Sequence, residues 1–364
     1  MKKHLYMIDI YRIFAVFIVF VFHLNIHFNF QIHIKIIDRF INQGATVMTL
    51  FFMLSGFLLY YLHGETNLMI WENFKYFCKK RILKIYPLYI SFIAIFYILF
   101  YTKENFNPII IFMQIIPLQG FFQKTFSIAT NGGTWFISVI FFAYLCFPFL
   151  AFILKSIKFN SFILFFLSYI LCNYFVVTDL YYTDNLLHLY ISPIFRLLEF
   201  FIGMITAKIF IETKQKINLN SKFYNFILTL CIFGYLLFVG GLSHSKYLNN
   251  VYFCNSYLNY DIGIIILFAL ILYFSAIIEN SFFYKIAKNK VTQYLSKISY
   301  SFYLTQCIVL GYFLKHKNIL SNNYKIFFIT IICNLILASF MYEFIQNNRL
   351  YLFIKSLHTK FIHN

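Results

Sequence analysis

Residues 8–28 read IDIYRIFAVFIVFVFHLNIHF, and this stretch decides the fold. Every residue from Ile13 to Phe22 is apolar, and a helix needs about 20 predominantly apolar residues to cross a bilayer. No small-x-small cleavage site follows, so the run lacks the mark of a removed signal peptide. The stretch predicts a membrane-spanning helix that carries Asp9, Arg12 and His23.

The whole chain has a composition that agrees with this first helix. Of its 364 residues, 61% are hydrophobic and 12% charged, against about 45–50% and about 25% in soluble domains. This balance excludes an ordinary water-soluble globular protein. The net charge of +18 could suit a nucleic acid, but the bases lie between apolar runs, as in multispanning membrane proteins. We therefore expect the lipid bilayer, and no nucleic acid, as a partner.

Nine more apolar segments follow the first one. The predicted fold class is all-α, a polytopic membrane bundle of about ten transmembrane helices. The expected spans are 8–28, 45–62, 85–102, 134–154, 160–177, 189–211, 223–241, 260–278, 298–314 and 325–345. The stretch 106–122 contains Pro108, Pro117 and Gly120, so we expect an interfacial or re-entrant piece there rather than an eleventh span.

The distribution of bases predicts the orientation. In a ten-span arrangement twenty Lys and Arg residues fall on one side, including those of a basic loop at 63–84, and eight on the other. Both termini are therefore expected in the cytoplasm. Residues 1–364 are expected to form a single transmembrane domain with no appended soluble domain. The seven cysteines lack metal-type spacing, so neither a metal site nor a disulfide is predicted.

Ionisable residues inside a span are the first candidates for function, because each costs about 2.5–3.5 kcal/mol at a helix centre. Asp9, Arg12 and His23 share one stripe of the first helix, since eleven residues separate Arg12 from His23, about three turns. The helical rise places His23 about 16 Å beyond Arg12. Simpler interpretations remain open: an ion pair that anchors the helix end, and a core histidine with satisfied hydrogen bonds.

Other polar residues have similar alternatives. Ser55 and Gly56 lie in mid-span, where small residues also favour close helix packing. Arg81 and Lys84 are one turn apart at the expected cytoplasmic mouth, where they could hold a phosphate or simply follow the positive-inside rule.

Two later spans also carry polar groups. Arg196 and Glu199 can neutralise each other at i, i+3 without any function. The hydroxyls of the segment from Ser299 to Gln306, which contains Tyr303, could hydrogen-bond across helices.

Together these segments resemble the acyltransferase 3 family of integral membrane acyltransferases, in order and over nearly the whole chain. The matching segments are Asp9-x-x-Arg12 with the later His23, Phe51-Phe52-x-x-Ser55-Gly56-Phe57, Arg81-x-x-Lys84-Ile85-x-Pro87, Trp135 to Pro148, Arg196-x-x-Glu199-Phe200-x-x-Gly203, and Ser299 to Leu304. Each motif alone is weak, but six in sequence are a strong signal. Lys84, Ile140 and Gln306 depart from the pattern, where Arg, Glu and His are common.

The resemblance implies transfer of an acyl group, usually acetyl, from cytoplasmic acetyl-CoA to a hydroxyl of a cell-surface polysaccharide or lipid-linked glycan. Acetyl-CoA would be a donor substrate, and no permanently bound cofactor is expected. The family's key histidine maps to His23, the expected general base, with a transient acyl-histidine as a variant. The Arg-rich motif on the CoA side maps to Arg81 and Lys84.

The other expected site residues follow from the same resemblance and from the helical geometry. Asp9 and Arg12 complete the expected catalytic set by orienting the donor or closing the inner half of the cavity, because they lie too far along the helix to touch His23. The expected substrate and cavity residues are Ser55, Arg196, Glu199 and Tyr303.

A different class of protein stays open. A transporter or flippase of acyl or saccharide intermediates would also place ionisable residues in mid-membrane, but it would not release CoA in response to an acceptor. Among the 30 bases only 5 are Arg, and Lys, Asn, Ile and Phe are abundant, which indicates an AT-rich bacterial genome. The expected location is therefore a bacterial inner or plasma membrane.

Overall fold

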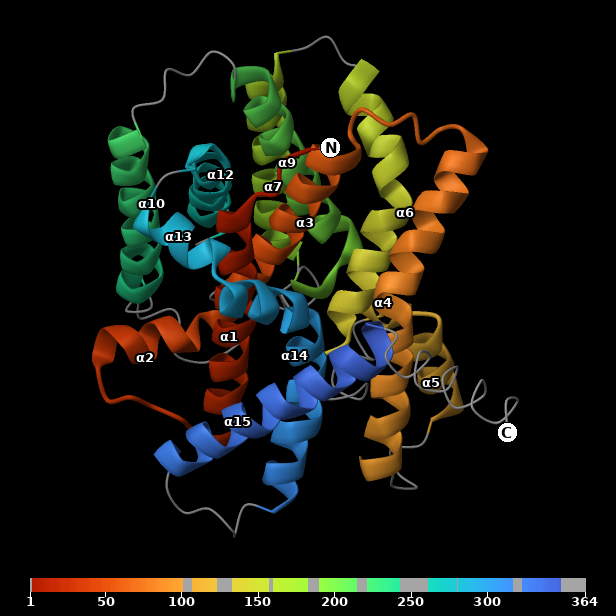
Figure 1. The fold of residues 1–364 in the computed structure, drawn as a ribbon, viewed down its shortest axis with the longest axis vertical. Coiled ribbons are helices and arrows are strands. Elements are labelled where there is room, and N and C mark those ends of the chain that lie inside the picture. The colour runs from red at the N-terminus through yellow and green to blue at the C-terminus, as the bar shows by residue number, and fades with distance from the viewer. Residues whose placement is uncertain are drawn as a thin grey trace, which may run out of the picture.

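The computed structural model describes residues 2–100, 107–122, 133–156, 160–182, 190–214, 221–242, 261–279, 281–316 and 323–347. Every regular element in these ranges is helical (Figure 1). The α-helices are α1 (Tyr6–Phe28), α2 (Lys35–Asn42), α3 (Val47–His63), α4 (Trp71–Phe100), α5 (Pro108–Ile115), α6 (Trp135–Ser156), α7 (Ser161–Tyr182), α9 (Pro193–Thr213), α10 (Ser221–Leu242), α12 (Asp261–Ile277), α13 (Phe282–Lys288), α14 (Lys290–Lys315) and α15 (Asn323–Met341). Short helical turns are η1 (Gly44–Thr46), η2 (Gln119–Phe121) and the π-helical η8 (Tyr342–Gln346).

Each of the ten predicted spans overlaps one of these helices. Within the described part of the chain, 6 helical segments are long and apolar enough to cross a membrane. They are Tyr6–Phe28, Gly44–His63, Trp71–Phe100, Trp135–Ser156, Lys222–Gly240 and Tyr324–Gln346. The pair formed by α12 and α13, bent by 80°, would add a seventh if counted as one span. The all-helical class is confirmed, while ten crossings and cytoplasmic termini stay predictions.

Two of the predicted spans are long helices, α9 and α14, that are not among these six segments because of their polar residues. The α9 helix contains Arg196, Glu199 and Lys208, and the first turns of α14 are polar. Both helices nevertheless bury much of their length: Arg196, Glu199 and Gln306 are all fully buried. Charged groups can remain at membrane depth when neighbouring helices surround them. Hydropathy alone therefore underestimates how many of the central helices could cross the membrane.

The predicted basic loop at 63–84 is wrong over most of its length, because α4 already begins at Trp71. Lysines are good helix formers, and the exposed Lys75, Lys79 and Lys80 extend this helix beyond its apolar part. The stretch 106–122 forms the 8-residue α5 and the turn η2. A helix of that length reaches only about 12 Å, too short to cross a bilayer.

The tightest crossing in the bundle joins α3 to α9. A Cβ atom added to Gly56 would lie 1.9 Å from the carbonyl oxygen of Phe200, and one added to Gly203 would lie 2.0 Å from that of Met53. The two backbones therefore meet directly, as small residues allow in membrane helices. Because Gly56 faces α9, the neighbouring Ser55 is turned toward a different side of α3.

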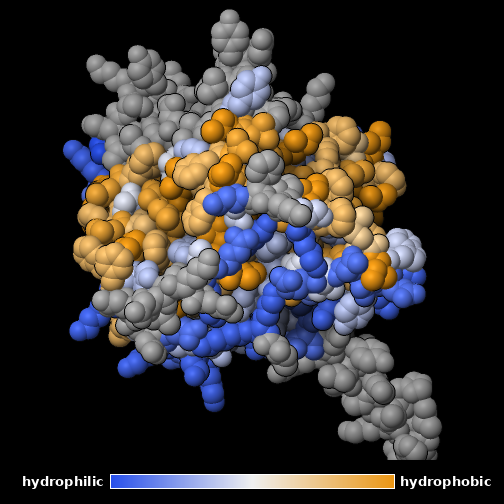
Figure 2. All heavy atoms as spheres, turned by 90° about the horizontal axis from the view of Figure 1, so that it is seen from above, coloured by the Kyte–Doolittle hydropathy of each residue, from blue (hydrophilic) through white to orange (hydrophobic). Residues whose placement is uncertain are grey.

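The surface separates into a polar end and apolar sides. Seen from above, hydrophilic residues gather across one end of the molecule, and hydrophobic residues cover the sides around it (Figure 2). The α4 helix begins near this end (Figure 1), and its Trp71, Ile82 and Leu83 are exposed. Such a distribution suits a protein whose sides contact lipid and whose end contacts water.

Candidate active site

A cavity of about 440 Å³ lies among α1, α3, α4, α6, α14 and η8. Its polar lining residues are His4, Asp9, Arg12, Ser55, Lys84, Tyr144, Gln293, Ser296, Lys297, Ser299, Tyr300, Tyr303, Tyr342 and Gln346. Its apolar lining residues are Val16, Phe51, Leu54, Ile85, Phe136 and Ile140. The volume lies within the range of about 300–1,000 Å³ that is usual for small-molecule sites.

Asp9 connects the first helix to α14 at one wall of this cavity. Its carboxylate accepts hydrogen bonds from Ser296 Oγ at 2.9 Å and Gln293 Nε2 at 2.9 Å. It also lies 2.6 Å from His4 Nε2 and 3.3 Å from Arg12 Nη1. A carboxylate with this many partners is held in place. The predicted Asp9–Arg12 pair exists, and Asp9 has the contacts of a positioning residue.

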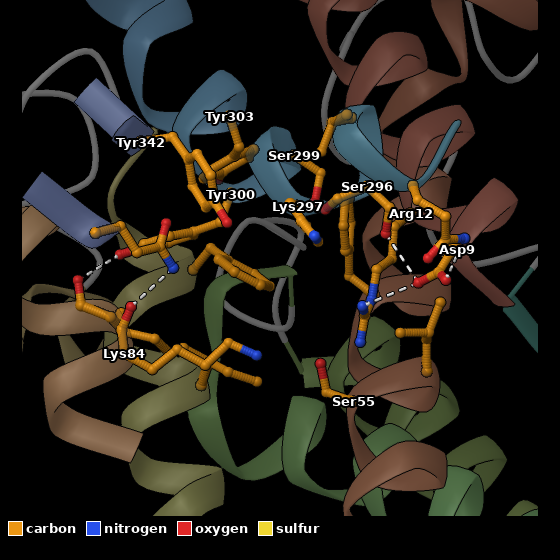
Figure 3. A pocket seen from close by; sticks show the side chains of 18 of the residues that line it. Asp9, Arg12, Ser55, Lys84, Ser296, Lys297, Ser299, Tyr300, Tyr303 and Tyr342 are labelled. Atoms are coloured by element: carbon orange, nitrogen blue, oxygen red, sulfur yellow. Dashed lines mark hydrogen bonds and ion pairs between the residues drawn. The ribbon is translucent and has the colours of Figure 1, made fainter. Parts of the chain in front are cut away.

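Three cations surround the open space of the cavity. Arg12 and Lys84 point into it from opposite walls, with the Lys297 ammonium and the Ser55 hydroxyl between them (Figure 3). Among the residues that the structure describes, Asp9 is the only acidic residue in the lining. Neither Lys84 nor Lys297 forms an ion pair with any residue that the structure describes. The cavity therefore has excess positive charge, which favours an anionic ligand.

Arg81 lies beside this cavity but does not line it. Its guanidinium donates to His63 Nε2 at 2.8 Å and lies over the rings of Phe77 and Tyr144, at 5.4 and 5.9 Å. Tyr144 separates it from the cavity, since that ring also belongs to the lining. The structure thus places Lys84 inside the cavity and Arg81 directly behind it.

The α14 helix supplies a polar stripe that the sequence analysis missed in part. Gln293, Ser296, Tyr300 and Tyr303 follow one another at intervals of three and four residues, so they share one face of the helix. The expected span began at residue 298 and left the first two in a loop. The spacing itself was the signal that could have found them.

Two tyrosines of this stripe are fixed by hydrogen bonds to other elements. Tyr303 donates to the carbonyl oxygen of Gly133 at 2.6 Å, and Tyr300 donates to that of Ile85 at 3.2 Å. Tyr303 also contacts the rings of Phe51 and Phe136. It therefore closes the side of the cavity next to α3 and α6.

His23 lies further along α1 and is not among the cavity-lining residues. Its ring is 6.4 Å from the ring of His27. The side chain of Gln306 on α14 lies within interaction distance of it. Gln306 is fully buried, and neither its Nε2 nor its Oε1 has a hydrogen-bond partner of regular geometry among the described residues. Buried amides without partners are rare, so His23 and Gln306 form a second polar centre.

Arg196 and Glu199 are fully buried and lie outside the cavity lining. Arg196 Nη1 lies 2.8 Å from a Glu199 carboxylate oxygen, and Thr49 donates to Glu199 at 2.9 Å. Arg196 also donates to the carbonyl oxygen of Tyr190 at 2.8 Å. This network connects α9 to α3 next to the crossing at Gly56 and Gly203. Its position indicates that Arg196 and Glu199 stabilise the packing of these two helices.

Five of the nine predicted site residues thus meet in one cavity. They are Asp9, Arg12, Ser55, Lys84 and Tyr303. Among the described residues, no group of three or more His, Cys, Asp or Glu side chains could hold a metal ion. The cavity offers cations and hydroxyls together with the imidazole of His4, the carboxylate of Asp9 and two amides. The imidazole of His23 and the amide of Gln306 lie further along α1 and α14.

Comparison with known proteins decides the family. A family model described as an acyltransferase domain matches residues 5–343, nearly the whole chain. The chain belongs to the acyltransferase 3 family. Membership in this family, together with the apolar helices, makes the protein a multi-pass membrane acyltransferase. No curated protein and no solved structure matches the chain.

Proposed function

We propose that this acyltransferase 3 protein moves an acetyl group from cytoplasmic acetyl-CoA to a hydroxyl of a cell-surface polysaccharide or lipid-linked glycan. The observation that carries the proposal is the cavity in which Arg12, Lys84 and Lys297 meet, with Asp9 as the only acidic lining residue in the described part of the chain. Acyl-CoA is an anion whose phosphates need such a surface. The bacterial inner or plasma membrane is the proposed location.

The cations would have different roles in binding the donor. Arg12 and Lys84 reach the cavity from opposite walls and would hold the CoA phosphates between them. Hydrogen bonds between charged partners are roughly twice as strong as neutral ones. Arg81 would hold no phosphate directly, because His63 and two aromatic rings already contact it. It would instead raise the positive potential behind Lys84.

The transfer step uses His23 as general base. The long pantetheine arm would extend along α1 and bring the thioester toward His23. The imidazole removes the proton of the acceptor hydroxyl as its oxygen attacks the thioester carbonyl. The new C–O bond forms, the C–S bond breaks, and the CoA thiolate leaves with the proton returned by the imidazolium. An acyl-histidine intermediate is the variant in which the ring itself attacks first.

Gln306 would assist this step as an oxyanion donor. Its amide is buried beside His23 and has no regular hydrogen-bond partner among the residues described. An amide N–H directed at the thioester oxygen would stabilise the negative charge that develops there. This assignment gives the departure from the family pattern at Gln306 a role.

The test is mass spectrometry of surface glycans from cells that lack the protein and are complemented with wild type or His23→Ala. We expect an acetyl increment only with wild type, because the base is missing in the variant. His33→Asn is the matched control, since His33 is exposed and its φ of 65° suits Asn. Membrane abundance of all three proteins must be equal.

The same experiment separates the enzyme from a transporter. Wild-type levels of acetylation with His23→Ala would refute the base assignment. If wild type restores no acyl group but changes glycan export or lipid-linked intermediates, the flippase alternative replaces the transferase. Acceptor-dependent release of CoA from purified protein gives the same distinction in vitro.

A further inference from the structure

A second cavity lies on the other side of α1 and has a different character. It measures about 520 Å³ and lies among α1, α3, α10, α12 and α13. The α1 helix lines it with Met7, Ile10, Tyr11 and Phe14. At 100° per residue, these side chains lie on the face opposite to Asp9 and Arg12. One helix therefore separates an apolar cavity from the cationic one.

The wall of this second cavity offers few groups to a polar ligand. Most of the lining is apolar, including Leu228, Ile232 and Phe268. The Tyr11 hydroxyl is 2.7 Å from Ser275 Oγ, and that of Tyr235 is 3.3 Å from Thr46 Oγ1. Hydroxyls engaged inside the bundle leave a surface that favours hydrocarbon.

The cavity opens to the outside of the bundle between α10 and α13. Phe282 and Phe283 line it and are 72% and 52% exposed, and the lining Leu236 on α10 is 38% exposed. In Figure 1 the short α13 lies between α10 and α1. The protein is a membrane protein, so the medium at such an apolar opening is lipid rather than water.

Two lysines lie within one helical turn of residues that line the cavity. Lys222 is one turn before the lining Asn225 on α10, and Lys285 is one turn after the lining Ser281. Both are exposed, and neither has an ion pair with any residue in the described ranges. Cationic side chains near an apolar cavity match a phosphate headgroup joined to a hydrocarbon chain.

We propose that this cavity binds one acyl chain of an anionic phospholipid whose phosphate contacts Lys222 and Lys285. The site is independent of acyl transfer, and a bound chain would pack against the face of α1 behind Asp9 and Arg12. It would act as a structural lipid that fixes the first helix.

The test is native mass spectrometry of the purified, delipidated full chain titrated with dioleoyl phosphatidylglycerol. Wild type should retain one lipid. Ile232→Trp should reduce its occupancy at least fivefold, because the indole fills the cavity. Leu230→Trp, exposed on the same helix and not part of the lining, is the matched control and should behave as wild type. Ile232→Phe keeps the test valid if the larger substitution prevents folding.

A second experiment tests whether the lipid phosphate contacts Lys222 and Lys285. Lys222→Gln combined with Lys285→Gln should weaken phosphatidylglycerol binding roughly tenfold and leave phosphatidylcholine unaffected, with Lys75→Gln as control. The proposal is overturned if both Ile232 variants retain the lipid as wild type does. Displacement of the lipid by inorganic phosphate, or by equimolar undecaprenyl phosphate, would also overturn it, because the site would then select another ligand.

Discussion

Lys84 is the residue at which donor binding can be measured most directly. Its ammonium points into the cavity opposite Arg12. Lys84→Gln should raise KM for acetyl-CoA roughly 10- to 100-fold, because a hydrogen bond to a charged group contributes about 1.5–3 kcal/mol. Lys84→Arg should at least preserve binding, since a guanidinium holds phosphate at two points. Steady-state rates of acceptor-dependent CoA release give both values.

The matched control for Lys84 is Lys80, one turn earlier on α4. Lys80 is exposed and lies 5.4 Å from the ring centre of Tyr76. Lys80→Gln should leave KM within twofold of wild type. Equal KM values for the two Gln variants would contradict donor binding by Lys84.

Replacing the buried Gln306 amide should lower activity without lowering stability. Gln306→Leu should lower kcat roughly 10²-fold, because one oxyanion donor is lost. The melting temperature should stay the same or rise, since the change removes a buried amide that lacks regular partners. A stopped assay for kcat and thermal unfolding in detergent check the two effects. A fall in stability with unchanged kcat would show that Gln306 only packs.

At the scale of residues, the sequence predicted those parts of the site that depend on helical spacing. Asp9 and Arg12 lie one turn apart and pair as expected. Arg196 and Glu199 also pair, but no spacing rule could show that their network faces α3 and not the cavity. That distinction depends on how α9 is rotated against its neighbours, and a single sequence does not contain it.

At the scale of helices, the crossing of α3 and α9 gives the clearest prediction. Gly56→Ala or Gly203→Ala should each destabilise the protein by about 1–3 kcal/mol or more, because a Cβ would lie 1.9 or 2.0 Å from backbone atoms. Gly234→Ala on α10 is the control: its Cβ would lie 3.7 Å from the nearest atom. Thermal unfolding should rank Gly234→Ala at or above wild type, owing to helix propensity.

The outcome that would contradict this account is an equal melting temperature for all three alanine variants. The α3–α9 crossing would then tolerate separation, and the position of Ser55 would not depend on it. A loss of activity with Gly56→Ala that parallels the loss of stability would connect this crossing to the cavity.

Helix positions were predictable because apolar runs of about 20 residues have few alternatives. The ends of the helices were less predictable than their positions. The α4 helix begins at Trp71 and α14 at Lys290, well before their apolar parts. Lysine-rich segments form helix without being apolar, so hydropathy recognises the part of a helix in lipid and misses its polar extension. In α14 that extension holds part of the cavity lining.

At the scale of the whole molecule, charge and burial are arranged together. The Gly44–His63 segment is 78% buried across its apolar window, while Trp71–Phe100 is 28% buried. The central helices can therefore be less hydrophobic than the outer ones, because protein rather than lipid surrounds them. This explains why α9 and α14 are not among the six apolar segments although their Arg196, Glu199 and Gln306 lie inside the bundle.

Membrane topology is the prediction that joins these scales. If α9 and α14 cross the membrane, Lys214 and Lys288 are cytoplasmic and Lys315 is external, in agreement with the excess of bases on the inner side. Single cysteines at these three positions, in a chain without its native cysteines, can be labelled in intact cells with a membrane-impermeant maleimide. Lys315→Cys should react at once, and the other two only after permeabilisation. Equal reactivity of Lys288→Cys and Lys315→Cys would mean that α14 does not cross the membrane, and the ten-span arrangement would then be wrong at this helix.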